Sequence, residues 1–237
     1  MRTYADLHLR PPLDDLDNAR SMARLLTELQ VGLVGLVVPP ERLTPLPAIV
    51  ELFRTEGIDV AKRLNLRPKS REELLRSLRR LRGKYEVISV ECSVPSVSRV
   101  AVRDRRVDLV HFAGREHSSM LRGKLAKTRR AAMEIRLSDL TSAPGLGAGL
   151  HRLKSEIETT VQGSTRVIGS TGASNPHELR SPRDIAAILT LVGLPLESAL
   201  AAVSDAPLQI VRKNRLKLEQ PQFEEGVRIL RRPRRNE

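Results

Sequence analysis

The feature that most constrains this chain is a repeated alternation of short apolar runs with amphipathic stretches. The runs are rich in β-branched residues, as buried strands are, and the stretches between them place apolar residues at helical spacing. The pattern predicts helices at residues 16–30, 46–55 and 71–81. It predicts strands at residues 3–9, 33–38, 58–66, 87–92, 107–112, 131–136 and 166–170.

Such strand–helix repetition requires parallel strands joined by crossover helices, and a long series of units favours a barrel over an open sheet. We therefore predict a TIM-like, distorted α/β barrel. A dinucleotide-binding fold is disfavoured, because Arg10, Pro11 and Pro12 follow the first strand where that fold needs glycines. The glycines of residues 142–150 lack the lysine of a phosphate-binding loop, and we interpret them as a loop that opens a helix.

Two consecutive helices are predicted near the C-terminus, with no strand between them. In residues 181–194, we expect Ser181 to cap the helix, Pro182 to take its first position and Gly193 to end it. A second helix follows at residues 196–204. The pair is expected to pack as a helical hairpin at the end of the barrel.

The barrel is predicted to form one domain, residues 1–230, with a short strand at residues 226–230 and a basic tail at residues 231–237.

The longest apolar run, residues 31–38, is far shorter than the roughly 20 residues of a membrane-spanning helix, and the polar start resembles no signal peptide. The single cysteine, Cys92, suits a reducing compartment. We expect a soluble, cytoplasmic protein that does not bind membranes.

The charge balance points to a polyanionic partner. The chain has 41 Lys and Arg residues against 28 Asp and Glu, for a net charge of +13. Such an excess favours nucleic acid over the weaker alternative of an anionic membrane surface. Because aromatic residues make up only 2% of the chain, few side chains can stack on single-stranded bases. Binding through phosphates and the shape of folded RNA is therefore expected.

Basic residues concentrate in residues 62–84, in residues 122–130, and in residues 212–217 together with the tail. The first stretch forms a phosphate-binding face if its cations, Arg63 and Arg82 included, point one way. Each stretch could instead be a solvated helix face. The candidate RNA contacts in the three stretches are Arg79, Arg80, Lys124, Arg129, Arg130 and Lys213.

Arg180 and Arg183 are further candidates for RNA contact. Arg180 directly precedes the Ser181 cap, beside backbone N–H groups that favour an anion at a helix N-terminus. A phosphate there would meet both. The alternative is an ion pair of Arg180 with Glu178 or Asp184.

Asp6 and His8 stand two residues apart in the first predicted strand, which raises the question of a metal site. A hydrolytic metal needs several ligands gathered from different strand ends. A structural role for Asp6 and His8, with hydrogen bonds to neighbouring strand ends, is therefore favoured. The ligands that could be assembled for a metal are His8, Glu91, His111, Glu134 and His177.

A more specific signal lies in residues 167–194. The strand end Ser170-Thr171-Gly172-Ala173 leads to the stretch Leu179-Arg180-Ser181-Pro182-Arg183-Asp184. With the Asp-Leu-His opening and residues 107–110, this resembles the protein component 3 family of ribonuclease P, the archaeal counterparts of a eukaryotic subunit of ribonucleases P and MRP. The resemblance covers nearly the whole chain, and the Leu-Arg-Ser-Pro-x-Asp stretch is its specific part.

The resemblance implies an α/β barrel that acts as a protein cofactor in tRNA 5′-leader removal, with the catalytic Mg²⁺ ions held by the RNA subunit. It implies ribonuclease P RNA and other protein subunits as partners, especially a small component 2-type protein. It implies no catalytic residue, metal or cofactor on this chain.

The family is also similar to the polymerase-and-histidinol-phosphatase phosphoesterases, whose first motif reads Asp-x-His-x-His. Here Arg10 replaces the second histidine. Asp6, His8 and Arg10 are then a vestigial strand-end site. A metal-dependent phosphoesterase is the alternative function.

Overall fold

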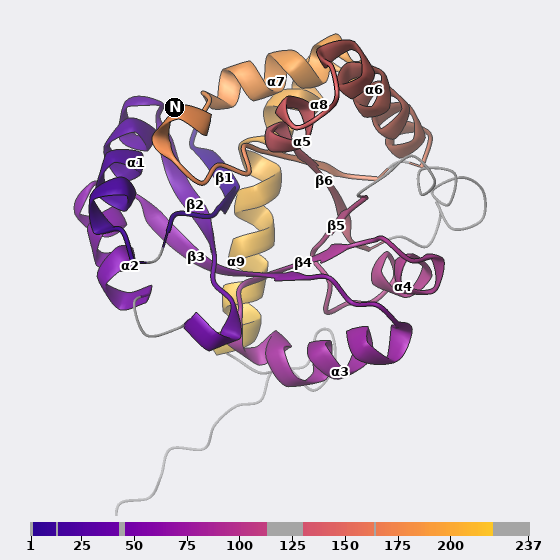
Figure 1. Ribbon diagram of the computed structural model, residues 1–237, viewed down its shortest axis with the longest axis horizontal. Helices are drawn as coiled ribbons and strands as arrows, with labels where there is room; N and C mark the ends of the chain where they lie inside the picture. Colours follow the sequence, from indigo (N-terminus) through magenta and orange to yellow (C-terminus); the bar gives the residue numbers. More distant parts are fainter. Residues whose placement is uncertain (1, 13, 43–45, 113–129, 164, 220–237) are drawn as a thin grey trace, which may run out of the picture.

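The computed structural model describes residues 2–219, except residues 13, 43–45, 113–129 and 164. Seven parallel strands form a nearly closed ring with helices around it (Figure 1), which confirms the predicted TIM-like barrel. The strands are β1 (Tyr4–Leu9), β2 (Val31–Val37), β3 (Asp59–Leu66), β4 (Val87–Glu91), β5 (Leu109–His111), β6 (Ala132–Arg136) and β7 (Val167–Ser170).

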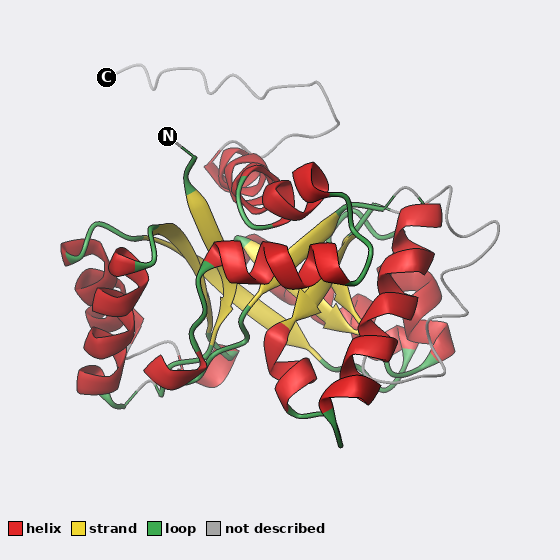
Figure 2. Cartoon of the chain, turned by 90° about the horizontal axis from the view of Figure 1, so that it is seen from above, coloured by secondary structure: helices red, strands yellow, loops and turns green. Residues whose placement is uncertain are grey.

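The α-helices pack mainly against the outside of the ring, as Figure 2, turned by 90° from Figure 1, shows. The predicted helices at residues 46–55 and 71–81 have the predicted bounds. Short 3₁₀ helices lie at Pro40–Arg42 (η1), Arg82–Lys84 (η2) and Pro176–Glu178 (η5). The α-helices are α1 (Leu16–Glu28), α2 (Leu46–Thr55), α3 (Arg71–Leu81), α4 (Pro95–Ala101), α5 (Leu137–Thr141), α6 (Leu146–Gln162), α7 (Pro182–Leu191), α8 (Leu196–Ala202) and α9 (Asp205–Glu219).

The helical hairpin predicted near the C-terminus is formed by α7 and α8, which pack against each other. The Ser181 hydroxyl accepts a hydrogen bond from the backbone N–H of Asp184 at 3.1 Å, so it caps α7 as expected. Gly193 has φ of 104°, a conformation that glycine adopts at no steric cost, and it ends the helical segment.

Helix α9 was not predicted, because its apolar residues are interspersed with basic ones. It crosses the ring in Figure 1 (yellow) and closes the end of the barrel at which the strands begin. There Ala206 and Val211 pack against the first inward-facing side chains of the strands. These are Ala5, Leu33, Ala61, Val87, Leu109, Ala132 and Ile168.

The ring has a seam between β7 and β1. Each described strand pairs with the next one in the order β1 to β7, and the ladder does not continue from β7 to β1. The chain that follows α8 fills part of the gap, since the Ala5 N–H donates to the Val203 carbonyl at 2.9 Å. The residue that follows the α7–α8 hairpin therefore bonds to β1 at the seam.

Strand β1 is irregular along its pairing with β2, where the register shifts between Asp6 and Leu9. Within this stretch the Leu7 carbonyl accepts a hydrogen bond from Arg63 in β3. Gly35 in β2 makes room for the arrangement, because a Cβ at this position would lie 2.2 Å from the Leu7 oxygen. The close approach of β1 and β2 thus requires glycine.

Several predicted segments fall outside the described residues. They are the strand at residues 226–230, the tail at residues 231–237, and most of the basic stretch at residues 122–130. Within the described part of the chain, no helix combines the length and the apolar character needed to cross a membrane.

Candidate functional site

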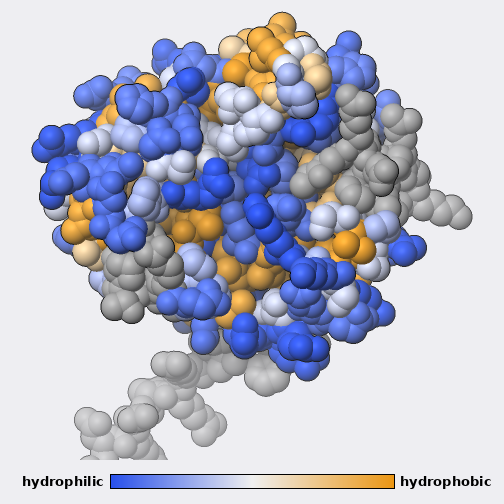
Figure 3. All heavy atoms as spheres, viewed as in Figure 1, coloured by the Kyte–Doolittle hydropathy of each residue, from blue (hydrophilic) through white to orange (hydrophobic). Residues whose placement is uncertain are grey.

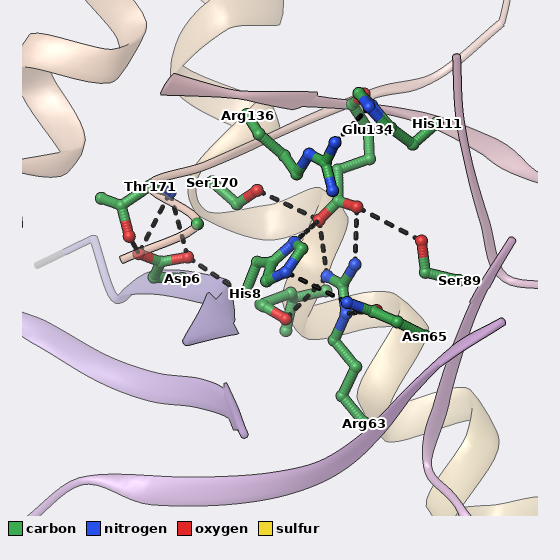
Figure 4. A network of polar contacts seen from close by, with 12 residues as sticks. Asp6, His8, Arg63, Asn65, Ser89, His111, Glu134, Arg136, Ser170 and Thr171 are labelled. Carbon is green, nitrogen blue, oxygen red and sulfur yellow. Dashed lines mark hydrogen bonds and ion pairs between the residues drawn. The ribbon is translucent and has the colours of Figure 1, made fainter. Parts of the chain in front are cut away.

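Polar side chains line the barrel interior above the apolar layer that α9 closes. They occupy alternate strand positions, as in Ala61, Arg63 and Asn65 of β3, because side chains two residues apart along a strand face the same side. Figure 4 shows the cluster from close by. The interior cluster consists of Asp6, His8, Arg63, Asn65, Ser89, Glu134, Ser170 and Thr171.

A fully buried ion pair between Arg63 and Glu134 lies at its centre. The guanidinium contacts the carboxylate with both terminal nitrogens, at 2.5 Å (Nη1 to Oε1) and 2.6 Å (Nη2 to Oε2), and both side chains are 0% exposed. Nη1 also donates to the Leu7 carbonyl at 2.8 Å. Burial alone would raise the pKa of Glu134, but the adjacent Arg63 charge holds it well below its usual range.

His8 and Asn65 close a ring of hydrogen bonds around this pair. His8 Nδ1 lies 3.3 Å from Glu134 Oε1, and because a carboxylate only accepts, Nδ1 carries the proton. His8 Nε2 then accepts from the Asn65 amide at 3.1 Å, and Asn65 Oδ1 accepts from Arg63 Nε at 2.7 Å. Burial and the Arg63 charge lower the pKa of His8 to about 3, so His8 is neutral near pH 7.

Two hydroxyl groups use the remaining acceptor capacity of Glu134. Ser170 donates to Oε1 at 3.0 Å, and Ser89 approaches Oε2 at 3.3 Å. Both carboxylate oxygens are therefore occupied by donors of the protein itself. The hydrogen-bonding groups of the cluster thus satisfy one another, and the network stabilises the barrel interior.

This network does not fit the metal site that the sequence allowed. The described residues contain no group of three or more His, Cys, Asp or Glu side chains placed to hold a metal ion. Of the possible ligands, Glu91 pairs with Arg67 at 2.9 Å, and His177 lies exposed on η5. A guanidinium occupies the centre instead, so a bound cation would have to displace Arg63 from Glu134.

Asp6 bridges the seam of the barrel. Its carboxylate accepts from the Thr171 N–H, at 3.3 Å to each oxygen, and from the Thr171 hydroxyl. The His8 N–H donates to the same group at 3.0 Å. Burial raises the pKa of Asp6 to about 6, although these hydrogen bonds act in the opposite direction. Asp6 and His8 thus make the contacts with neighbouring strand ends that a structural role requires.

Arg10 turns away from this interior and lies on the surface. Its guanidinium donates to the Gly172 carbonyl, at 3.2 Å from Nε and 2.8 Å from Nη2, and its backbone N–H donates to the Ala173 carbonyl at 2.8 Å. Arg10 therefore ties the end of β1 to the segment after β7. The interpretation of Asp6, His8 and Arg10 as a vestige of a metal site stays a prediction.

A second buried group lies beside the interior cluster. His111 Nδ1 is 3.5 Å from the Glu134 carbonyl, and its Nε2 faces Arg136. Arg136 is in turn held by Asp139, at 3.0 Å from both Nε and Nη2. Burial and the Arg136 charge lower the pKa of His111, so this histidine is also a neutral structural element.

The candidate RNA contacts lie on separate sides of the molecule. Arg79 and Arg80 are exposed on α3, whereas Arg180 and Arg183 are exposed at the start of α7, across the ring from α3 (Figure 1). Further candidates are exposed Lys213 on α9 and exposed Arg130 before β6, and Lys124 and Arg129 lie outside the described residues. The fold does not gather them into one patch.

The predicted ion pair of Arg180 with Glu178 or Asp184 is not among the interactions of the described residues. Arg180 Nη1 donates instead to the carbonyls of His177 and Leu179, at 2.8 and 2.6 Å. The Glu178 carboxylate accepts from Ser174, at 2.6 Å from its N–H. The described interactions of Arg180 are therefore with backbone carbonyls.

The cations of residues 62–84 do not all point one way, which was the condition for a phosphate-binding face formed by the whole stretch. Arg63 points into the barrel, and Arg82 pairs with Asp108 at 2.5 Å. In the third stretch, Arg215 pairs with Asp59 at 2.5 Å and also with Glu86, which fastens α9 to the strands. These cations form ion pairs within the protein and are not available to a partner.

Sequence reasoning missed Arg63, Asn65 and Ser89 as members of the interior. The signal was present, since Arg63 and Asn65 alternate with apolar residues in β3 and follow the inward-facing Ala61. Counting Arg63 with the surrounding cations concealed this periodicity.

Comparison with known proteins identifies relatives of the whole barrel. The family model described as RNase P subunit p30 matches residues 4–219. The ribonuclease P protein component 3 of Methanosarcina acetivorans is 29% identical over 181 residues, which cover 74% of this chain and 73% of the relative. That of Methanopyrus kandleri is 27% identical over 228 residues, which cover 90% of this chain and 93% of the relative.

Two solved structures share the fold. A chain in the cryo-EM structure of archaeal ribonuclease P with mature tRNA matches with a TM-score of 0.76 and 19% identity, covering 97% of this chain and 100% of that chain. An amidohydrolase crystal structure matches with a TM-score of 0.55 and 14% identity, covering 90% and 74%. Because the family model spans the barrel from β1 to the end of α9, the chain belongs to the RNase P subunit p30 family.

Proposed function

We propose that this chain is a protein subunit of ribonuclease P that binds RNA and takes no part in bond breaking. Its family, relatives named ribonuclease P protein component 3, and the fold it shares with a chain of archaeal ribonuclease P support this role. The chain would act in the cytoplasm with ribonuclease P RNA and other protein subunits, including a small component 2-type protein. The RNA subunit would carry the Mg²⁺ ions that remove the 5′ leader of precursor tRNA.

The observation that carries the non-catalytic part of the proposal is the occupied carboxylate of Glu134. Arg63, His8, Ser89 and Ser170 together engage both of its oxygens. Metal-dependent phosphoester hydrolysis needs ligands with free lone pairs and an open coordination position. In the described interior both oxygens of Glu134 already accept hydrogen bonds, and no group of three or more possible ligands is gathered, which disfavours the alternative of a metal-dependent phosphoesterase.

The observation that supports RNA binding is the set of exposed cations outside the interior. Arginine forks bind phosphate oxygens in pairs and keep their charge at any physiological pH. We propose as contacts the exposed residues Arg79, Arg80, Arg130, Arg180, Arg183 and Lys213, together with Lys124 and Arg129.

Reconstitution tests the proposal directly. Precursor tRNA is incubated with ribonuclease P RNA and the other protein subunits, with and without this chain, and leader release is measured. The chain should raise the cleavage rate in the mixture and should release no leader when it is alone with the substrate. An unchanged rate would contradict the proposal.

A second assay addresses the alternative functions. The purified chain is analysed for bound Zn²⁺ and Mn²⁺, and hydrolysis of a generic phosphodiester is measured before and after EDTA. Stoichiometric metal with EDTA-sensitive turnover would establish the phosphoesterase. Binding to anionic vesicles that matches its RNA binding would instead favour a membrane-surface role.

A further inference from the structure

The outward surface of α3 carries exposed arginines for which the described interactions include no ion pair. Leu74, Leu78 and Leu81 are buried against the barrel and define the inner side of the helix. Residues three or four apart share a helix face, so Arg76, Arg79 and Arg80 project together on the outer side, where all three are exposed. We call these three residues the arginine face.

The acidic residues of α3 are confined to its first turn and serve the helix itself. The Ser70 hydroxyl accepts from the Glu73 N–H at 3.2 Å, and the Glu73 carboxylate accepts from the Lys69 N–H at 2.8 Å. From residue 74 to residue 84 the sequence contains basic residues and no acidic one. Glu72 stands four residues before Arg76, but the interactions of the described residues include no ion pair between them, and Arg79 and Arg80 have no acidic residue within four positions along the helix.

Ion pairing separates these arginines from others on the protein. Arg20 pairs with Asp17, and Arg24 pairs with Glu56. Among the interactions of the described residues, none neutralises Arg76, Arg79 or Arg80. Like charges three and four residues apart on a helix destabilise it by roughly 0.2–0.5 kcal/mol per pair. A bound polyanion would relieve this repulsion.

The cationic surface continues beyond α3. Helix α4 packs beside α3 and exposes Arg99, and Lys84 is exposed in η2, immediately after α3. In Figure 3, strongly hydrophilic residues cover the surface over α3, at the bottom of the view. Exposed cations thus continue from α3 along this edge of the molecule into η2 and α4.

The side chains of this edge suit a double helix better than single-stranded bases. Single strands are held by stacking on exposed aromatic rings, whereas double-stranded RNA is recognised through its shape, phosphates and sugar hydroxyls. The aromatic residue closest in sequence to the arginine face, Tyr85, is 1% exposed. The face therefore offers forked cations without a stacking platform.

We infer that the arginine face of α3 binds the phosphate backbone of double-helical RNA. This inference rests on the proposed function and names the surface and the RNA structure involved. The arginines would contact phosphates along the duplex without reading its sequence, and their contribution to affinity would depend strongly on salt.

The test measures binding of the full-length chain to an RNA duplex of about 20 base pairs, slightly longer than the roughly 16 that a double-stranded-RNA-binding module spans. Affinities are compared between about 50 and 200 mM salt for the wild type and the triple variant Arg76→Ala, Arg79→Ala, Arg80→Ala. The variant should bind on the order of tenfold more weakly, and its log–log salt slope should be smaller by up to about three.

The matched control is Arg20→Ala, Arg24→Ala, Arg54→Ala, which removes the same charge from exposed positions on α1 and α2. It should retain most of the wild-type affinity and slope. The triple variant Arg76→Lys, Arg79→Lys, Arg80→Lys keeps the charge and should keep the slope while losing affinity through the missing forks.

Three results would overturn the inference. One is an equal loss of duplex affinity in the α3 variant and the control, which would mean that only net charge matters. Another is that the α3 variant loses as much affinity for a single strand of the same length as for the duplex. The third is a wild type that binds the duplex and an α3 variant that binds it equally well. In that case the face is wrong, while leader cleavage in the reconstituted enzyme still tests the proposed function separately.

Discussion

Arg63 in β3 and the arginine face of α3 belong to one strand–helix unit, yet they are in opposite electrostatic environments. Arg63 is 0% exposed and its guanidinium is engaged by Glu134, Asn65 and the Leu7 carbonyl. Arg76, Arg79 and Arg80 are exposed, and the described interactions provide none of them with a carboxylate. Arginine therefore forms a buried ion pair that stabilises the interior in one place and is an exposed cation in the other.

The difference shows why counting charges is a poor guide to a binding surface. A buried arginine requires a partner, because removing a charge from water costs several kcal/mol. An exposed arginine has no such requirement and stays available. The net charge of +13 thus overstates the attraction of a polyanion to some surfaces of the protein and understates it at others.

Removing Arg63 should have the largest effect on stability. Arg63→Met would leave the Glu134 carboxylate buried without its cation, and the free energy of unfolding should fall by about 3–5 kcal/mol. Urea denaturation measures the change. The double variant Arg63→Met, Glu134→Met should recover most of the loss, because neither charge is left alone. A loss below about 1 kcal/mol in the single variant would show that the pair is not essential to the interior.

Gly35→Ala should disturb the same interior through the backbone. A Cβ would lie 2.2 Å from the Leu7 oxygen, which is an acceptor for Arg63, so β1 must shift. The free energy of unfolding should fall by about 1–3 kcal/mol in urea denaturation. Gly147→Ala is the control, since nothing lies within 4 Å of that Cβ in α6, and it should be neutral or stabilising. Similar losses in both variants would contradict this account.

Asp6 should impose a pH dependence on stability. Its pKa is raised from 3.8 to about 6, so between these values the folded chain keeps a proton that the unfolded chain has released. Stability therefore falls as pH rises through this window. Relative to Asp6→Asn, the free energy of unfolding of the wild type should fall by roughly 2 kcal/mol as the pH rises from ~4 to ~6.

The measurement is urea denaturation of both proteins across that pH range. Glu156→Gln is the control. Burial raises the pKa of Glu156 from 4.5 to about 7, so the pH range over which Glu156 affects stability extends above that of Asp6. Parallel pH profiles for wild type and Asp6→Asn would show that Asp6 titrates normally.

The triple α3 alanine variant should have the smallest effect on stability, despite losing three charges. Exposed substitutions away from buried contacts usually change the free energy of unfolding by less than about 0.5 kcal/mol, and removal of like-charge repulsion favours the helix. Urea denaturation with circular dichroism checks this. A loss comparable to that of Arg63→Met would mean that the arginine face supports the fold as the buried Arg63 does.

The local elements of the barrel were readable from the chain. Helix α3 begins after the predicted strand and has the predicted bounds because its cap and its apolar residues lie within one short stretch. The Ser181 cap of α7 was foreseen for the same reason. Helix α9 was missed because its burial depends on the open end of a barrel formed by residues far away in the chain.

The candidate site divides in the same manner. Asp6 and His8 attracted attention through their spacing, and a structural role with contacts to neighbouring strand ends was expected. Their partners, Thr171 in the segment after β7 and Glu134 in β6, stand more than a hundred positions later.

Hydrophobic periodicity and capping residues act over a few neighbours, so the sequence by itself determines the strand–helix order and the barrel class. Which arginine lies inside, which acid neutralises it, and which cations are left exposed depend on contacts across the ring. Those contacts exist only after the ring has formed, because Arg63 is then buried inside the barrel whereas Arg67, four residues later, is exposed beyond the end of β3.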